Sequence, residues 1–391
     1  MLTELMEPWD LNLRHLAAFL ETCRKGSVNA AASSVSLSQP AVTQAIARLE
    51  SQLKLALFDR QTNGMRPTEP ARQFHSRVER ALNFVGSSRV TSAQAKAFVA
   101  LARGGSYAEA SALTGLAPAS LHRSISDLEL ALGRDLVERR GRGIELTKRG
   151  RETARQFRLA RAELNAGLDE LSIFRGENEA RISVGAMPLC RAKLLPSAVV
   201  EFQKSRPSSE LAIAEGSFME LIEPLRDGEL DLLIGALRTP SPGPDVIQTP
   251  LFEDHPVFLG RRDHPLRHKS GAVTLEELTG YSWVLPPRGV PLREQWQRLF
   301  EQDGLKVPDI PVESGSAMII RQLLMETNYL TVLSPDQVAI ELEAGWLGIV
   351  GRPPEQLSRT IGMFTRAGWY PTEMQEEFVD TLKKHSEQSG H

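Results

Sequence analysis

Apolar side chains between Leu13 and Leu53 recur every three or four positions, a spacing that predicts three helices with one buried face each. The positions that define these faces are Leu13, Leu16, Phe19, Leu20, Val42, Ile46, Leu49 and Leu53. Gly26-Ser27 and Ser36–Ser38 supply the turns between a first helix, a second at about 28–35 and a third at 39–53. Two short extended segments on either side of Gly64 then predict a β-hairpin.

The same pattern returns further along the chain without a gap, at the offset that separates Phe98 from Phe19. At this offset Leu49-Glu50 matches Leu128-Glu129. Further matched pairs are Gly26/Gly105, Ser27/Ser106, Ala31/Ala110, Leu37/Leu116, Ile46/Ile125, Leu53/Leu132, Leu57/Leu136, Arg60/Arg139, Gly64/Gly143 and Thr68/Thr147. So many agreements at one offset indicate a single structural unit that is used twice.

Three helices and a hairpin are typical of a winged helix-turn-helix fold, whose third helix presents its N-terminal polar side chains to the DNA major groove. In the first copy Ser38 is a favourable N-cap and Pro40 fits the first turn. Glutamine can pair with adenine through two hydrogen bonds, and threonine can contact thymine. The candidate DNA-binding residues of the first copy are Ser38, Gln39, Pro40, Thr43, Gln44 and Arg48, with Arg60 and Arg66 in the hairpin. Those of the second copy are Ser120, His122 and Arg123, with Arg140 and Arg142 in a more basic hairpin.

Beyond residue 178 the pattern changes to short apolar strands that alternate with helices. Strands are predicted at 182–186, 211–215 and 230–235, and a similar set follows to about residue 350. Such alternation favours a parallel α/β sheet, in which ligands gather at the carboxyl ends of the strands. The candidate ligand-binding residues in those loops are Met187, Pro188, Arg191, Ser217, Arg238, Arg288 and Ser316. Arg191, Arg238, Arg288 or Arg293 would supply the countercharge to an anionic ligand.

The charge is divided between the two halves of the chain, although the net charge of the whole is only −3. Residues 1–175 carry 25 Lys and Arg against 18 Asp and Glu, whereas the remainder carries 21 against 31. The basic half suits a polyanion such as DNA, and the acidic half does not. No apolar run approaches the length of about 20 residues that a membrane span needs, and a cytoplasmic location is expected.

The sequence contains no motif that favours an enzyme, a metal site or a cofactor. HExxH, GxSxG, P-loop and GxGxxG patterns are absent, so we expect no catalytic activity. Cys23 and Cys190 are the only cysteines and lie far apart, which argues against a disulfide framework or a zinc site. Cys190 stands at a predicted helix start, where a thiolate is favoured, but a small, partly buried filler is the better interpretation because the C-terminal module has no second cysteine.

The string Leu37-Ser38-Gln39-Pro40-Ala41-Val42-Thr43, followed by Arg48-Leu49-Glu50 and Leu57-Phe58-Asp59-Arg60, closely resembles the N-terminal domain of LysR-type transcriptional regulators. The resemblance implies base-reading roles for Gln39, Pro40 and Thr43. It also implies a linker helix at about 148–171 whose apolar stripe is a dimer seam, and an effector-binding module similar to periplasmic binding proteins. The second copy has Ala117-Pro118-Ala119-Ser120 at the signature, so those base-reading roles do not transfer to it.

The sequence therefore predicts a multidomain protein with two helix-rich winged helix-turn-helix domains and an α/β effector domain of two subdomains. The expected bounds are 11–88, 89–147, a linker and dimerisation helix at 148–175, and 178–391 with the second subdomain at about 248–350. The predicted function is a transcriptional regulator that binds double-stranded DNA as a homodimer or homotetramer, controlled by a small-molecule effector held between the subdomains. The alternative is a partner-binding protein that sequesters another regulator by hetero-oligomerisation and binds little DNA.

Overall fold

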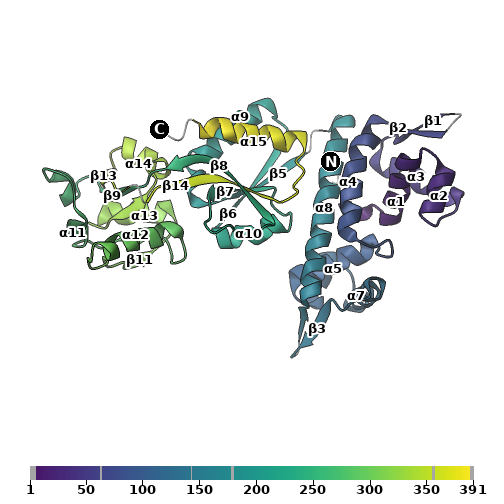
Figure 1. Cartoon of the computed structure of the whole chain (residues 1–391), viewed down its shortest axis with the longest axis horizontal. Coiled ribbons are helices and arrows are strands. Elements are labelled where there is room, and N and C mark those ends of the chain that lie inside the picture. The colour runs from purple at the N-terminus through teal and green to yellow at the C-terminus, as the bar shows by residue number, and fades with distance from the viewer. Residues whose placement is uncertain (1–5, 62–63, 142, 178–179, 355–356, 388–391) are drawn as a thin grey trace. The chain divides into compact units, whose positions relative to one another are not determined.

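The computed structural model describes residues 6–61, 64–141, 143–177, 180–354 and 357–387 (Figure 1). The chain divides into two compact units, with the boundary between Arg181 and Ile182. Two short later segments, Ser208–Glu210 and Arg226–Glu229, also belong to the first unit. Each unit has its own hydrophobic core, so each is described by itself.

The first copy in the first unit has three helices, a hairpin and a fourth helix. Its elements are η1 (Pro8–Asp10), α1 (Leu13–Lys25), α2 (Val28–Ser34), α3 (Gln39–Leu53), β1 (Phe58–Gln61), β2 (Gly64–Pro67) and α4 (Glu69–Val85). Side-chain oxygens cap the α-helices at their N-termini, from Asn12, Ser27, Ser38 and Thr68. Gly26, with φ of 63°, ends α1 in the left-handed conformation that glycine adopts most readily.

The second copy repeats these elements at a constant distance along the chain. Its elements are α5 (Ser92–Gly104), α6 (Tyr107–Thr114), α7 (Pro118–Leu132), β3 (Val137–Arg140), β4 (Gly143–Leu146) and α8 (Lys148–Phe174). The start of each element is shifted from its counterpart by the same amount, as Leu13 is from Ser92. The hairpin registers also agree, with Phe58 opposite Pro67 and Val137 opposite Leu146. The predicted duplication is confirmed.

Helices α4 and α8 lie side by side in opposite directions and join the two copies into one core (Figure 1). The apolar stripe of α8 is buried within the chain and consists of Ala154, Phe157, Ala160, Leu164, Leu168 and Leu171. The resemblance led us to expect this stripe in a seam between protomers. The structure differs because α4 of the same chain offers its own apolar face, made of Phe74, Val78, Ala81 and Val85.

The second unit contains two α/β lobes. The first lobe has a five-stranded sheet of order β6-β5-β7-β14-β8, where β5 and β7 are parallel and β14 is antiparallel to β7 and β8. Its elements are β5 (Arg181–Ala186), η2 (Pro188–Arg191), α9 (Leu194–Ser205), β6 (Glu210–Glu215), α10 (Phe218–Arg226), β7 (Leu232–Ala236), β8 (Val246–Asp254), β14 (Arg359–Arg366) and α15 (Glu373–Ser386). Strand β8 belongs to this lobe, although the sequence placed the start of the second subdomain at about residue 248, because it pairs with the returning strand β14.

The second lobe has a three-stranded antiparallel sheet of order β12-β9-β13 and a parallel pair, β10 and β11. Its elements are β9 (Val257–Arg261), η3 (Pro265–His268), α11 (Leu275–Leu278), β10 (Val284–Leu285), α12 (Pro291–Gln302), β11 (Val312–Glu313), α13 (Ala317–Glu326), β12 (Thr331–Leu333), η4 (Pro335–Val338), α14 (Ala339–Glu343) and β13 (Leu347–Gly351). Trp283, Trp296 and Phe300 form an aromatic cluster in its core. The predicted fold class is confirmed, with a mixed sheet in place of a purely parallel one.

Candidate nucleic-acid interface and ligand-binding lobes

The predicted reading residues of the first copy lie together on the outer face of α3. Val42, Ile46 and Leu49 are buried on the opposite face, which leaves the polar positions toward solvent. Ser38 caps the helix by accepting a hydrogen bond from the Ala41 amide at 3.4 Å. The exposed residues are Ser38, Gln39, Pro40, Gln44 and Arg48, while Thr43 is half-buried and donates its hydroxyl to the Gln39 carbonyl at 3.1 Å.

The hairpin of the first copy is tied to its reading helix by the side chain of Glu50, and its base is closed by the hydroxyl of Thr68. Oε1 of Glu50 accepts hydrogen bonds from the amides of Leu57 at 2.8 Å and Phe58 at 3.3 Å. The Thr68 hydroxyl donates to the Ala56 carbonyl at 2.8 Å. These bonds fix the strands β1 and β2, on which Arg60 and Arg66 are both exposed.

The N-terminus of the reading helix in the second copy, α7, differs from that of α3. Ala117 occupies its N-cap position and provides no side-chain hydrogen bond. The candidates for base contact in this copy, Ser120, His122 and Arg123, are all exposed. The His122 ring stacks on Tyr107, with ring centroids 5.0 Å apart and planes 17° apart.

Tyr107 is a residue of this surface that the sequence did not single out. It begins α6, and together with Pro118, Ala119, His122 and Arg123 it lines a shallow hollow at the exposed end of α7. The place of Tyr107 at the start of the second helix was predictable from the sequence. Its stacking on His122 was not, because it depends on the His122 rotamer, which the sequence does not indicate. The second head therefore offers a flat aromatic pair where the first offers amide and hydroxyl groups.

The second hairpin is anchored as the first is, by the matched residues. Oε1 of Glu129 accepts from the amides of Leu136 at 2.7 Å and Val137 at 3.2 Å, and the Thr147 hydroxyl donates to the Asp135 carbonyl at 3.0 Å. The sequence predicted a hairpin more basic than the first, and the structure modifies that prediction at Arg140. Arg140 is exposed but pairs with Glu145 on the opposite strand at 2.6 Å, which offsets its charge. Arg142 lies outside the described residues.

The candidate residues of the first ligand-binding loop have structural roles. Met187 is only 5% exposed and packs against Gly235, so it is a core residue rather than a ligand contact. Pro188 begins η2. Arg191 donates from Nε to the Ala186 carbonyl at 3.0 Å and from Nη2 to the Gly216 carbonyl at 3.2 Å, and its Nη1 lies 3.0 Å from Glu215. Its guanidinium therefore joins the ends of β5 and β6 and is not available as it stands for an anion.

Arg238 lies at the end of β7 and is a better candidate. Its guanidinium carbon is 4.5 Å from the centre of the Phe218 ring, and its buried Nε has no hydrogen-bond partner among the described residues. Burial lowers the pKa of Arg238, the nearby Arg359 lowers it further, and Glu294 acts in the opposite direction. Because Glu294 is on α12, Arg238 lies on the side of the first lobe that faces the second.

Arg293, one residue before Glu294, combines burial with incomplete pairing. Its side chain is 6% exposed, and within the described part of the chain Nε and Nη1 have no hydrogen-bond partner, while Nη2 is 3.8 Å from Glu313. It lies 5.6 Å from the Trp296 ring. Burial is the main cause that lowers the pKa of Arg293; Glu313 acts in the opposite direction, and Arg288 lowers the pKa further. A cation in the first turn of α12 is disfavoured by the helix dipole, which makes this position attractive to an anion.

The other predicted ligand residues are exposed at loop ends. Arg288 is exposed in the loop before α12. Ser217 is exposed, and its amide donates to Glu220 at 2.7 Å. Ser316 caps α13 by accepting a hydrogen bond from the Ile319 amide at 3.5 Å. Lys193 in the first lobe pairs with Asp336 in the second at 2.9 Å, a link between the lobes beside η2 and η4.

Both cysteines should resist alkylation and disulfide exchange in the folded protein. Burial raises the pKa of Cys23 and of Cys190 to about 12 each, so the thiolate is scarce at pH 8. We expect Ellman's reagent at pH 8 to react with neither thiol before unfolding and with both in guanidinium chloride. Glutathione serves as the reactive control, and rapid reaction of one thiol in the folded chain would contradict the protection expected of the partly buried Cys23 or the buried Cys190.

Among the described residues, no cluster of His, Cys, Asp or Glu could hold a metal ion. None of the helices in the described ranges is long and apolar enough to span a bilayer.

Comparisons with known proteins agree with both parts of the fold. A model of the LysR substrate binding domain matches residues 175–387. A model of the bacterial regulatory helix-turn-helix protein of the lysR family matches twice, at 13–72 and 92–151. These two matches begin where α1 and α5 begin, so they have the same offset as the structural elements.

The HTH-type transcriptional regulator GalR of Pseudomonas putida is 31% identical over 370 residues, which cover 91% of this chain and 93% of GalR. The alignment leaves too little of this chain unmatched to omit either copy. The SDS degradation transcriptional activation protein of a Pseudomonas species is 30% identical and covers 70% of this chain and 90% of its own length.

Two solved structures show the fold. ArgP from Mycobacterium tuberculosis has a TM-score of 0.58 at 17% identity and covers 76% of this chain and 98% of its own. A full-length OxyR variant from Pseudomonas aeruginosa has a TM-score of 0.55 at 23% identity, with coverage of 76% and 94%.

Proposed function

The chain belongs to the LysR family of bacterial transcriptional regulators, with DNA-binding helix-turn-helix copies and an effector-binding domain, and from this we propose that both copies contact operator DNA. The observation that carries the proposal is the exposure of two polar reading faces, on α3 and α7, each tied to its hairpin by the matched glutamate, Glu50 or Glu129. The proposed contacts are Ser38, Gln39, Pro40, Thr43, Gln44, Arg48, Arg60 and Arg66 in the first copy, and Ser120, His122, Arg123 and Arg140 in the second.

The two lobes would bind a small anionic effector between them. Arg238 and Arg293 support this proposal, because both are buried cations whose pKa values are lowered and whose nitrogens are incompletely paired within the described residues. An anion that reached them would relieve the cost of burying charge without a full set of partners. We further propose that the protein acts in the cytoplasm, as a homo-oligomer and without catalytic activity. The two segments that match the helix-turn-helix model do not favour the alternative, a protein that sequesters another regulator and binds little DNA.

The DNA proposal is tested by fluorescence anisotropy with double-stranded DNA from upstream of the protein's own gene. Gln39→Ala/Thr43→Ala and His122→Ala/Arg123→Ala should each weaken specific binding at least tenfold, since each good base contact contributes about 1–3 kcal/mol. Gln73→Ala on α4 and Arg103→Ala on α5 are controls that remove an exposed amide or one positive charge outside the reading helices. If the two double variants bind as tightly as the controls, these helices do not read the DNA.

The effector proposal is tested by thermal unfolding in the presence of a panel of small mono- and dicarboxylates. At least one compound should raise the melting temperature of the wild type, because a ligand that binds the folded state stabilises it. The response should be lost in Arg293→Met and kept in Arg298→Met, which removes an exposed arginine from the same helix. Equal responses in both variants would remove Arg293 from the site.

A further inference from the structure

We propose that a single chain is a complete two-headed DNA reader, in which the two winged-helix copies are paired about a pseudo-two-fold axis and read two adjacent, unlike half-sites. The inference rests on the proposed function and specifies the class of DNA that it recognises. It differs from a tandem array of independent domains, and from pairing of identical heads between two chains.

The first sign of the axis is a contact between equivalent residues. The Leu13 amide donates to the Ser92 hydroxyl at 3.2 Å, and these positions correspond under the offset between the copies, as the first residues of α1 and α5. Two residues related by a two-fold rotation can touch only near the rotation axis. The first turns of α1 and α5 therefore meet close to such an axis.

The second sign is the crossing of α4 and α8, which are also equivalent elements. Gly167 packs against the Phe74 ring, and Arg80 pairs with Glu163 at 2.8 Å, so the two helices run in opposite directions. Phe74 and Gly167 set the register of the two antiparallel helices. Seven residues further along α4 and seven residues back along α8, this register brings Ala81 opposite Ala160. These two alanines occupy equivalent positions in the two copies. Both alanines are fully buried, and their small side chains permit close approach at the crossing.

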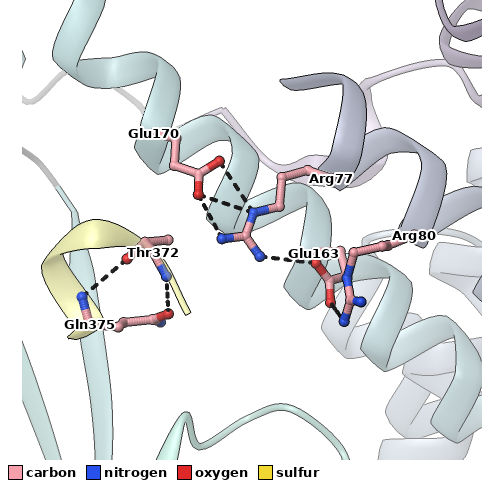
Figure 2. A network of polar contacts seen from close by, with 6 residues as sticks. All are labelled: Arg77, Arg80, Glu163, Glu170, Thr372 and Gln375. Carbon is pink, nitrogen blue, oxygen red and sulfur yellow. Dashed lines mark hydrogen bonds and ion pairs between the residues drawn. The ribbon is translucent and has the colours of Figure 1, made fainter. Parts of the chain in front are cut away.

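The pairing buries faces that neither copy could leave in water. Arg77 on α4 is 1% exposed and is bound by Glu163 at 3.1 Å and Glu170 at 2.6 Å, both on α8 (Figure 2). A Cβ on Gly167 would lie 2.8 Å from the Phe74 ring. If α8 paired with α8 of another chain instead, the apolar face of α4 and the Arg77 guanidinium would lose these partners. The covalent connection also gives the two copies a high effective concentration for each other.

The DNA consequence follows from symmetry and from the side chains at matched positions. Two-fold-related reading helices contact half-sites one helical turn apart, or a multiple of it. Thr43 and Gln44 in the first head correspond to His122 and Arg123 in the second, and Arg48 corresponds to Asp127. A pair of identical heads reads an inverted repeat, whereas these two heads read an operator whose halves differ.

In vitro selection from random double-stranded DNA with the full-length chain tests this. The wild type should select two dissimilar motifs at one fixed spacing, with centres about 10 base pairs or a multiple apart. Thr43→Ala/Gln44→Ala should erase one motif, and His122→Ala/Arg123→Ala only the other. An inverted repeat lost completely in one variant would show that identical heads pair between chains. A wild type that enriches no sequence would overturn the proposed DNA-reading function itself.

A second measurement distinguishes pairing within a chain from exchange of heads between chains. Glu7 and Lys96 form an ion pair between the two copies at 2.6 Å, which a carbodiimide can convert into an amide. Light and isotopically heavy chains are unfolded and refolded together, coupled and analysed by mass spectrometry. The Glu7–Lys96 cross-link should join peptides of the same label only, and Lys96→Arg should abolish it. Mixed-label cross-links would overturn the single-chain reader.

Discussion

Replacement of Arg77 by methionine should lower the free energy of unfolding of the first unit by about 3 kcal/mol, the cost of breaking a buried ion pair by removing one partner. Arg77 donates from Nε to Glu170 at 3.1 Å and 3.2 Å, from Nη2 to Glu170 at 2.6 Å and from Nη1 to Glu163 at 3.1 Å (Figure 2). Although burial opposes the charge, these carboxylates raise the pKa of Arg77 above its ordinary value. Methionine fills much of the space but leaves two carboxylates at a nearly closed helix crossing.

Hydrogen exchange of the α4 and α8 amides in the full-length chain measures this loss, because it reports the first unit separately from the second. Arg80→Met is the matched control, since Arg80 also pairs with Glu163 on α8, at 2.8 Å, but is 32% exposed. We expect that control to cost less than about 1 kcal/mol. The triple variant Arg77→Met/Glu163→Gln/Glu170→Gln should recover part of the loss. Equal effects of Arg77→Met and Arg80→Met would contradict a buried ionic junction.

Replacement of Glu50 or Glu129 by alanine should detach the hairpin of its own copy and leave the other hairpin in place. Each change removes the acceptor of two backbone amides, Leu57 and Phe58 in one copy and Leu136 and Val137 in the other. Leu57 and Leu136 are fully buried, so their amides would have no water to replace the carboxylate. The expected local cost is about 2 kcal/mol per copy, from unsatisfied buried donors.

The measurement is amide hydrogen exchange at these four residues, combined with selection of DNA motifs by each variant. Glu50→Ala should increase exchange at Leu57 and Phe58 and weaken one motif, and Glu129→Ala should do the same for the second copy. Glutamine at either position keeps a carbonyl oxygen as acceptor and should preserve most of the protection. Loss of protection in both hairpins from one change would show that the glutamates stabilise the common core instead.

The first unit was predictable in detail because its evidence is local and repeated. Capping serines and threonines, glycine turns and one buried face per helix are properties of short segments, and the second copy tested each assignment made in the first. The partner of an apolar stripe is a different kind of information. The stripe of α8 fits any apolar face of similar shape, so its pattern did not reveal that Phe74 and Ala81 of the same chain cover it.

The ligand-binding candidates were harder to predict because a loop position does not determine where a side chain points. Met187 and Arg191 stand in a strand-to-helix loop, yet one enters the core and the other binds two backbone carbonyls. Arg293 had no burial signal in the sequence, since arginine is ordinarily exposed. The pairing of Arg140 with Glu145 could have been anticipated from the hairpin, because alternate positions on paired strands share a face.

The separate encoding of α3 and α7 has a consequence for how this regulator changes over time. In a dimer of identical chains, one substitution in the reading helix alters both halves of the recognition site at once. In the single-chain reader proposed above, a substitution in α3 would alter one half and leave the partner helix α7 as it was. The operator sequences in the genome could then change in one half at a time, and each mutational step in the protein would retain the contacts to the other half. Under this proposal the duplicated head would make the change to a new operator gradual, whereas a reader with two identical heads would change both halves in a single step.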